Sequence, residues 1–178
     1  MSARTRHTGQ LVLAALMTAL TAVCAQIQIP LPPVPVSLAT LCVYLCGALL
    51  PPRYAAYAMA SYALLGLCGV PVFAGFAAGP SALLGPTGGY IAGYVFSSPV
   101  IALLLRKTGL TPRALALSMA AGAALCCLMG TLWFIFITGS SLSAALFSCV
   151  LPFLPGEAAK ITVAAILSMR IKRAVHSI

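Results

Sequence analysis

Charged side chains divide this sequence into long uncharged stretches. Residues 7–52, 54–105 and 114–156 contain no Asp, Glu, Lys or Arg. Apolar residues make up 62% of the chain, and only 6% of residues are charged. A soluble domain of average composition carries about 25% charged residues. The sequence is therefore typical of an integral membrane protein, and we expect no separate soluble or catalytic domain.

Proline-rich and glycine-rich segments separate the apolar stretches into helices, because proline removes a backbone donor and fixes φ. We predict a single all-α membrane domain spanning residues 1–178. Its six transmembrane helices are expected at residues 9–29, 37–50, 54–68, 84–106, 112–138 and 144–171. The segment Pro30–Pro35 is predicted to be an extended apolar loop. The uncharged segment 69–83 is predicted to be a long loop, and loops of this length often have a function.

This six-helix arrangement places the basic residues on one side of the membrane. Of the ten basic residues, all except Lys160 fall on the side that holds both termini. They are Arg4, Arg6, Arg53, Arg106, Lys107, Arg113, Arg170, Lys172 and Arg173. The positive-inside rule then predicts that both termini are cytoplasmic. The same placement accounts for the net charge of +9 without a nucleic-acid partner.

Two ionisable residues lie inside the last apolar stretch. Glu157 is the only acidic residue of the chain, and Lys160 is the only basic residue deep in an apolar segment. A charge at membrane depth costs roughly 2.5–3.5 kcal/mol, so such residues pair with each other or face a cavity. Their i, i+3 spacing places both side chains on one helix face. We predict a ligand site here; the alternative is an ion pair that only fixes helix packing.

The residues before this pair predict a broken helix. The sixth helix is expected to be broken at Pro152 and Pro155. Pro155 suits the first turn of the second half, whose N-terminus would offer free N–H groups to an anion. The interruption also argues against a purely structural membrane subunit, because breaks of this kind mark binding sites in transporters.

A second polar segment, Gly85–Tyr90, leads into the fourth predicted helix. Its glycines permit close backbone approach, and Thr87 and Tyr90 add polar groups. No Lys-Ser/Thr follows the glycines, so the segment is not a phosphate-binding P-loop. The predicted topology places it, both apolar loops and the Glu157–Lys160 pair toward the outside, where they would form one pocket. The alternative is that the glycines only allow helices to pack closely.

Metal and catalytic chemistry have little support in the sequence. None of the seven cysteines forms a Cys-x-x-Cys pair, and both histidines lie in the terminal tails. No Ser–His pair, paired Asp or metal-ligand cluster accompanies Glu157 and Lys160, which argues against an intramembrane enzyme. We therefore expect no enzyme activity and no cofactor.

Four stretches together resemble a known family. They are IQIPLPPVPVSLATL at 27–41, GVPVFAGF at 69–76, GPTGGYIAGY at 85–94 and VLPFLPGEAAK at 150–160. In this order, and with six helices, the chain resembles the BioY family, the biotin-specific S components of energy-coupling factor (ECF) transporters. The resemblance implies an ECF S-component-like bundle in the bacterial cytoplasmic membrane that captures biotin from outside. A transmembrane coupling protein and two cytoplasmic ATP-binding subunits would drive uptake, and only those partners would use ATP.

The resemblance also implies roles for individual residues. Expected biotin-binding residues are Glu157, Lys160, Tyr90, Gly88, Gly89, Thr87, Thr40 and Phe73. Ala15 and Ala19, a small-residue pair on the first helix, would contact the coupling protein. The sequence departs from the family pattern at Glu157, where Asp is common, and at Ala39, where Gln is frequent. These departures leave an S component for a different vitamin as the main alternative.

Overall fold

The computed structural model describes residues 3–30 and 34–176, and within them the fold is all-helical apart from one two-stranded ribbon. The all-α prediction is confirmed. The elements are α1 (Ala3–Gln26), β1 (Gln28–Ile29), β2 (Val36–Ser37), α2 (Ala39–Leu49), α3 (Pro52–Leu67), the 3-10 turn η1 (Ala74–Phe76), α4 (Pro80–Leu84), α5 (Gly88–Thr108), α6 (Pro112–Thr138), α7 (Leu142–Cys149) and α8 (Phe153–His176).

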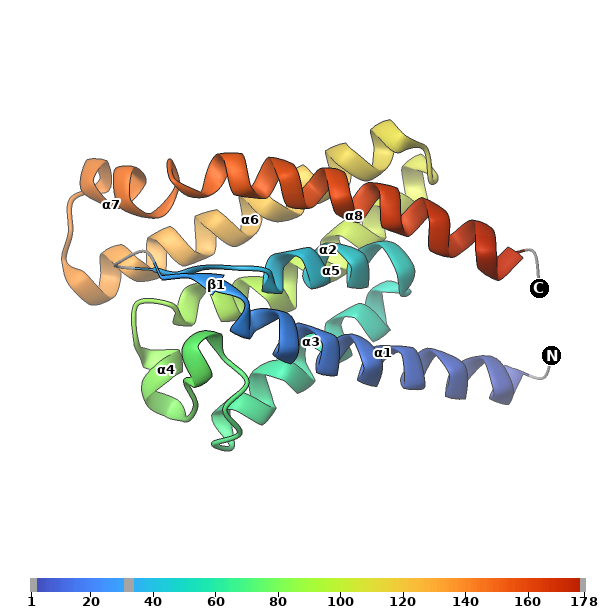
Figure 1. Cartoon of the computed structure of the whole chain (residues 1–178), viewed down its shortest axis with the longest axis horizontal. Coiled ribbons are helices and arrows are strands. Elements are labelled where there is room, and N and C mark those ends of the chain that lie inside the picture. The colour runs from blue at the N-terminus through green and yellow to red at the C-terminus, as the bar shows by residue number, and fades with distance from the viewer. Residues whose placement is uncertain (1–2, 31–33, 177–178) are drawn as a thin grey trace.

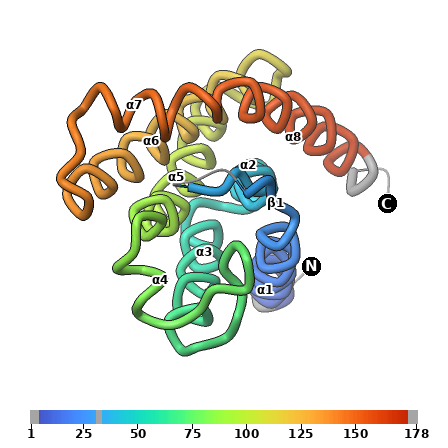
Figure 2. The backbone as a smooth tube through the Cα atoms, turned by 60° about the vertical axis from the view of Figure 1, so that its left-hand side comes forward, coloured from blue at the N-terminus to red at the C-terminus, as the bar shows by residue number. Residues whose placement is uncertain are grey.

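The helices form a bundle with α2 and α5 in its middle. Figure 2 shows α1 and α3 on one side of this pair and α6 and α8 on the other. In Figure 1, α1 begins and α8 ends at the same end of the bundle, where the α2–α3 and α5–α6 connections also lie. We call this the basic end, because Arg53, Arg106, Lys107 and Arg113 lie in or beside those connections. The opposite end, with β1, β2 and the α6–α7 connection, is the site end.

Length and composition identify the helices that can cross a membrane. Residues 5–26 of α1, together with α5 and α6, are long and apolar enough, and α7 and α8 form a fourth span if their 46° bend is counted as one broken helix. Large apolar side chains point outward, for example Phe136 at 79% and Leu117 at 72% exposure. This outward apolar surface is that of a multi-pass membrane protein.

Small residues allow the central helices to pack closely. A Cβ atom on Gly89 would overlap Trp133 of α6, and one on Gly122 would overlap Ile101 of α5. Hydrogen bonds add to this packing: the Thr18 hydroxyl of α1 donates to the Ala58 carbonyl of α3 at 2.8 Å. Small interfacial residues and interhelical hydrogen bonds are the usual means of helix association in membranes.

Helix bounds differ from the predicted ones where proline or strand pairing intervenes. The first helix ends at Gln26 rather than 29, because residues 28–29 pair antiparallel with 36–37. Residues 31–33 of the predicted extended loop lie outside the described residues. The helix expected from residue 84 begins at Gly88, since extended Gly85 separates it from α4. Helix α6 matches its predicted bounds, and Thr111 caps it by accepting from the Ala114 amide at 3.2 Å.

The break in the last span agrees with the prediction at Pro152. It lies at Val150–Pro152, between α7 and α8, and Pro155 is inside the first turn of α8. Proline is tolerated in a first turn, because its missing N–H has no intrahelical partner there. The amides of Phe153 and Leu154 both donate to the Val150 carbonyl. The expected row of free N–H groups at this terminus is therefore not present.

Candidate functional site

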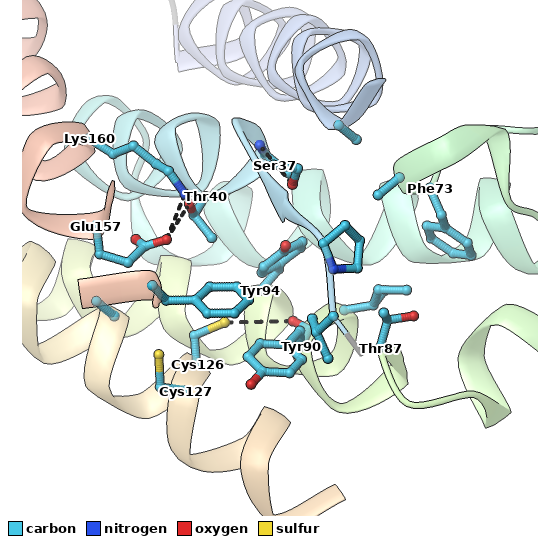
Figure 3. Close-up of a pocket in the computed structure, with 18 of the residues that line it drawn as sticks. Ser37, Thr40, Phe73, Thr87, Tyr90, Tyr94, Cys126, Cys127, Glu157 and Lys160 are labelled. Carbon is cyan, nitrogen blue, oxygen red and sulfur yellow. Dashed lines mark hydrogen bonds and ion pairs between the residues drawn. The ribbon is translucent and has the colours of Figure 1, made fainter. Parts of the chain in front are cut away.

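A buried cavity lies at the site end of the bundle, between α2, α5, α6 and α8 (Figure 3). Its volume is about 70 Å³. The connection that contains η1 and the segment around β2 cover it. Its polar and aromatic lining residues are Ser37, Thr40, Tyr44, Tyr62, Phe73, Thr87, Tyr90, Tyr94, Cys126, Cys127, Phe153, Glu157 and Lys160.

The ion pair predicted from the i, i+3 spacing is present. The Lys160 Nζ lies 2.7 Å from the Glu157 Oε1, and the two residues are only 7% and 8% exposed. Both side chains project from α8 toward Thr40, as Figure 3 shows. Removing two charges from water is costly, so a buried pair of this kind needs further hydrogen bonds.

Helix α2 supplies those hydrogen bonds. The Thr40 hydroxyl accepts from the Lys160 Nζ at 2.8 Å and donates to the Glu157 Oε1 at 3.0 Å. One turn further along α2, the Tyr44 hydroxyl donates to the other carboxylate oxygen, Oε2. Glu157 thus has three donors, whereas Lys160 uses two of its three N–H groups on described residues. The remaining ammonium N–H is available to a ligand.

Aromatic rings form the rest of the cavity wall. Tyr90 and Phe153 stack with their ring planes 9° apart and centroids separated by 6.1 Å. The Tyr90 hydroxyl donates to the Cys149 carbonyl at 3.2 Å, which joins α5 to the end of α7. Tyr94 lines the same cavity as the ion pair and is labelled in Figure 3. Such walls bury the apolar part of a ligand, while the few polar groups fix its orientation.

The connection between α3 and α4 covers the cavity and is fastened to α1. Phe73 is 3% exposed and contacts Tyr62 edge to face, with ring centroids 5.5 Å apart. The Gln26 side chain, at the end of α1, donates to the Phe73 carbonyl at 3.1 Å and accepts from the Phe76 amide at 2.9 Å. The cover is therefore held by specific contacts in this conformation.

The structure gathers most of the residues expected to bind a ligand. Six of them line the cavity: Thr40, Phe73, Thr87, Tyr90, Glu157 and Lys160. Gly88 and Gly89 do not. A Cβ on Gly88 would overlap the Leu83 carbonyl, and one on Gly89 would overlap Trp133, so both glycines serve close packing. Ala39 lines the cavity, so the presence of Ala where Gln is frequent in the family changes a surface that a ligand can contact.

Sequence reasoning missed Tyr44, although it contacts Glu157 directly. Its position is i+4 from Thr40, so the two share a helix face, and that spacing was the available signal. Tyr94, Phe153 and Cys127 were also missed. Nothing in their local sequence separates them from ordinary apolar wall residues.

Ala15 and Ala19 lie far from this cavity, on the outer surface of α1. They line an open groove between α1 and α3, together with Ala22, Tyr57 and Ser61. Both alanines are exposed. The small side chains leave space for a helix to approach α1 closely.

Within the described residues, no group of three or more His, Cys, Asp or Glu side chains is arranged to hold a metal ion. The described part of the site instead offers one carboxylate, one ammonium group and several hydroxyls in an apolar enclosure.

Comparisons with known proteins agree on one family. The BioY family model matches residues 1–177. The biotin transporter BioY of Thermotoga maritima is 38% identical over 164 residues, covering 92% of this chain and 96% of that protein. The probable biotin transporter BioY of Pyrococcus horikoshii is 34% identical, covering 90% and 94%.

A solved structure is similar as well. The crystal structure of the S-component for biotin from an ECF-type ABC transporter superposes with a TM-score of 0.88 at 26% identity. The alignment covers 97% of this chain and 95% of that chain. Sequence, fold and extent of coverage therefore lead to the same assignment: the chain belongs to the BioY family.

Proposed function

We propose that this chain is the substrate-binding membrane subunit of a biotin uptake system, and that its cavity captures biotin from outside the cell. The observation that carries the proposal is the buried Glu157–Lys160 pair, which lines a largely apolar cavity and, among the described residues, leaves one ammonium N–H without an acceptor. The family assignment supports the same ligand. A BioY protein of this kind binds and releases its ligand and carries out no reaction.

The chemistry of biotin suits this cavity. Its cyclic urea has two N–H donors and one carbonyl acceptor, so a carboxylate and an ammonium group side by side complement both. In our proposal Glu157 accepts from the urea, and Lys160 donates to a ligand oxygen, with Thr40 holding the pair in place. Tyr90, Tyr94 and Phe153 would enclose the apolar ring and chain.

The cavity must enlarge when the ligand enters. Small-molecule sites usually measure about 300–1,000 Å³, whereas this cavity measures about 70 Å³. The cover around Phe73 is the element we expect to move, because it is a non-helical connection with positive φ at Gly75 and Gly79. Releasing it requires breaking the two hydrogen bonds to Gln26.

The direct test is isothermal titration of the purified protein with biotin, with riboflavin and thiamine as control ligands. We expect one-to-one binding of biotin alone. The Lys160→Ala variant should remain folded and bind biotin roughly ten- to hundredfold more weakly, because a charge-assisted hydrogen bond is lost. Binding of another vitamin in place of biotin, or wild-type affinity in the folded variant, would refute the proposal.

Transport itself would depend on other proteins. We propose that a transmembrane coupling protein and two cytoplasmic ATP-binding subunits drive uptake, and that the coupling protein seats a helix against Ala15 and Ala19. The open groove between α1 and α3 supports this location.

The groove has a direct test. Ala15→Leu should retain biotin binding but reduce uptake by cells that express the partner subunits, because the larger side chain fills the groove. Leu16→Phe is the control, since Leu16 is 58% exposed but does not line the groove. Normal uptake by Ala15→Leu would exclude this groove as the interface.

We further propose six membrane crossings in a bacterial cytoplasmic membrane, with both termini in the cytoplasm. The clustering of basic residues at one end supports this orientation. Under it, α2 and α3 are short spans, and the uncharged site end opens to the outside. Orientation can be tested in a variant whose seven native cysteines are replaced, with single cysteines introduced at residue 107 or 140 and labelled with a membrane-impermeant reagent. Only residue 140 should react in intact cells.

A further inference from the structure

A second cavity lies at the basic end of the bundle, away from the ligand site. It is open to the surface and has a volume of about 330 Å³. The end of α2 forms its floor. Arg106 of α5, Lys172 of α8 and Gln10 of α1 line it, with Leu105 and Leu110 as apolar walls. Three helices distant in sequence thus bring two cations and an amide to one opening.

These two cations have no acidic partner in the chain. Glu157 is the only acidic residue in the sequence, and it is paired with Lys160 at the site end. Among the described side chains, neither Arg106 nor Lys172 has an ion pair or a hydrogen bond to a carbonyl oxygen. Lys172 is also half-buried, so water alone stabilises its charge less well than on an open surface. An anion from outside the protein would therefore balance the charges of Arg106 and Lys172.

Gln10 adds a second, independent requirement. Its side-chain Oε1 is buried and accepts no hydrogen bond from the described residues. A buried acceptor without a donor is unfavourable. A ligand that carries a hydroxyl donor next to its negative charge would satisfy both the amide and the cations.

We infer that this cavity binds the headgroup phosphate of an anionic phospholipid, of the phosphatidylglycerol type. Arg106 and Lys172 contact the phosphate, and Gln10 accepts from a glycerol hydroxyl. The location supports a lipid: the cavity lies where the spans end, at the level of the headgroups, and its leucine walls suit the start of an acyl chain. Basic pockets between transmembrane helices are known to hold such headgroups. A protein partner would need to insert an acidic side chain between three helices.

Two charge-matched double variants test the inference. Arg106→Gln with Lys172→Gln removes the cavity cations, whereas Lys107→Gln with Arg173→Gln removes two neighbouring charges that do not line it. Lys107 shares the last turn of α5 with Arg106, so each variant removes one positive charge that interacts favourably with the C-terminal end of the α5 dipole. Native mass spectrometry of the detergent-solubilised chain, with phosphatidylglycerol or phosphatidylcholine added, counts the lipids retained. Circular dichroism and size-exclusion chromatography establish that each variant is folded.

We expect wild type and the Lys107/Arg173 variant to retain one phosphatidylglycerol and no phosphatidylcholine. The Arg106/Lys172 variant should retain phosphatidylglycerol roughly tenfold or more weakly, since each basic residue near an anionic lipid contributes to its binding. Equal retention by both double variants would overturn the inference and leave only nonspecific attraction to the net charge. Thermal stabilisation of the wild-type chain by inorganic phosphate, if as strong as that by phosphatidylglycerol, would assign the site to free phosphate instead.

A single variant gives a second test if the double variant does not fold. Gln10→Glu places a carboxylate beside both cations and so supplies the anion from the protein itself. We expect it to be folded, to be at least as stable as wild type in lipid-free detergent, and to lose its thermal stabilisation by phosphatidylglycerol. Unchanged stabilisation by the lipid in this variant would also overturn the inference.

Discussion

Lys160 and Lys172 lie on the same helix, about 18 Å apart along its axis, yet their charges are balanced in different ways. Lys160 is 7% exposed and is held by Glu157 and Thr40. Lys172 is half-buried at the basic end and has no acid in the chain to pair with. Inside the bundle nothing but protein can neutralise a charge, so the chain supplies an acid there. At the membrane surface, headgroups and water can do so, and the chain contains no acid for that purpose.

The largest effect is expected from removing the internal acid. Glu157→Gln leaves the Lys160 ammonium buried without an anion, so we expect the free energy of unfolding to fall by about 3–5 kcal/mol. Thermal unfolding of the ligand-free protein in detergent measures the loss. Glu157→Asp is the control, because it keeps the charge, and it should lose much less stability. Equal stability of Glu157→Gln and wild type would mean that Lys160 is not charged in the bundle.

A smaller effect is expected from the residue that supports the carboxylate from α2. Tyr44→Phe removes the hydroxyl that donates to the Glu157 Oε2 and leaves the ring in place. The loss of a hydrogen bond to a charged group should weaken biotin binding by about 1.5–3 kcal/mol, or roughly tenfold or more. Titration calorimetry measures this change, with Tyr57→Phe as the matched control because Tyr57 is 56% exposed. If both variants bind biotin alike, Tyr44 has no part in the site.

The smallest effect is expected at the surface lysine. In lipid-free detergent, Lys172→Ala should change the free energy of unfolding by less than about 0.5 kcal/mol, as is usual for surface substitutions. Biotin affinity should stay within about twofold of wild type, because residue 172 is remote from the ligand cavity. A loss of affinity comparable to that of Lys160→Ala would show that the two ends of α8 are coupled.

The sequence predicted the parts of the site that depend on local geometry. The i, i+3 spacing of Glu157 and Lys160 was sufficient to bring their side chains together. Prolines and glycines marked several helix ends within a few residues, for example Pro112 at the start of α6. The absence of charge in long stretches established the membrane class, because few soluble folds tolerate it.

Contacts between distant helices were not predictable in the same way. Tyr44 reaches Glu157 only because α2 packs against α8; its i+4 spacing from Thr40 indicates a shared face but not which helix that face meets. Gly88 and Gly89 carry the expected motif but serve packing, since their role depends on the positions of Leu83 and Trp133. Of the two prolines predicted to break the last span, only Pro152 lies at the break, because proline is tolerated in a first helical turn and Pro155 occupies that of α8.

The uncharged connections at the site end have a consequence for the kinetics of capture. The segments 27–38, 69–83 and 139–143 contain no charged residue, and in the proposed orientation the basic end lies roughly 30 Å away across the bilayer, several Debye lengths distant. An anionic vitamin approaching from outside therefore gains no long-range electrostatic steering. Its association rate should be almost independent of ionic strength. Tight retention would then depend on slow release, governed by how rarely the cover over the cavity opens.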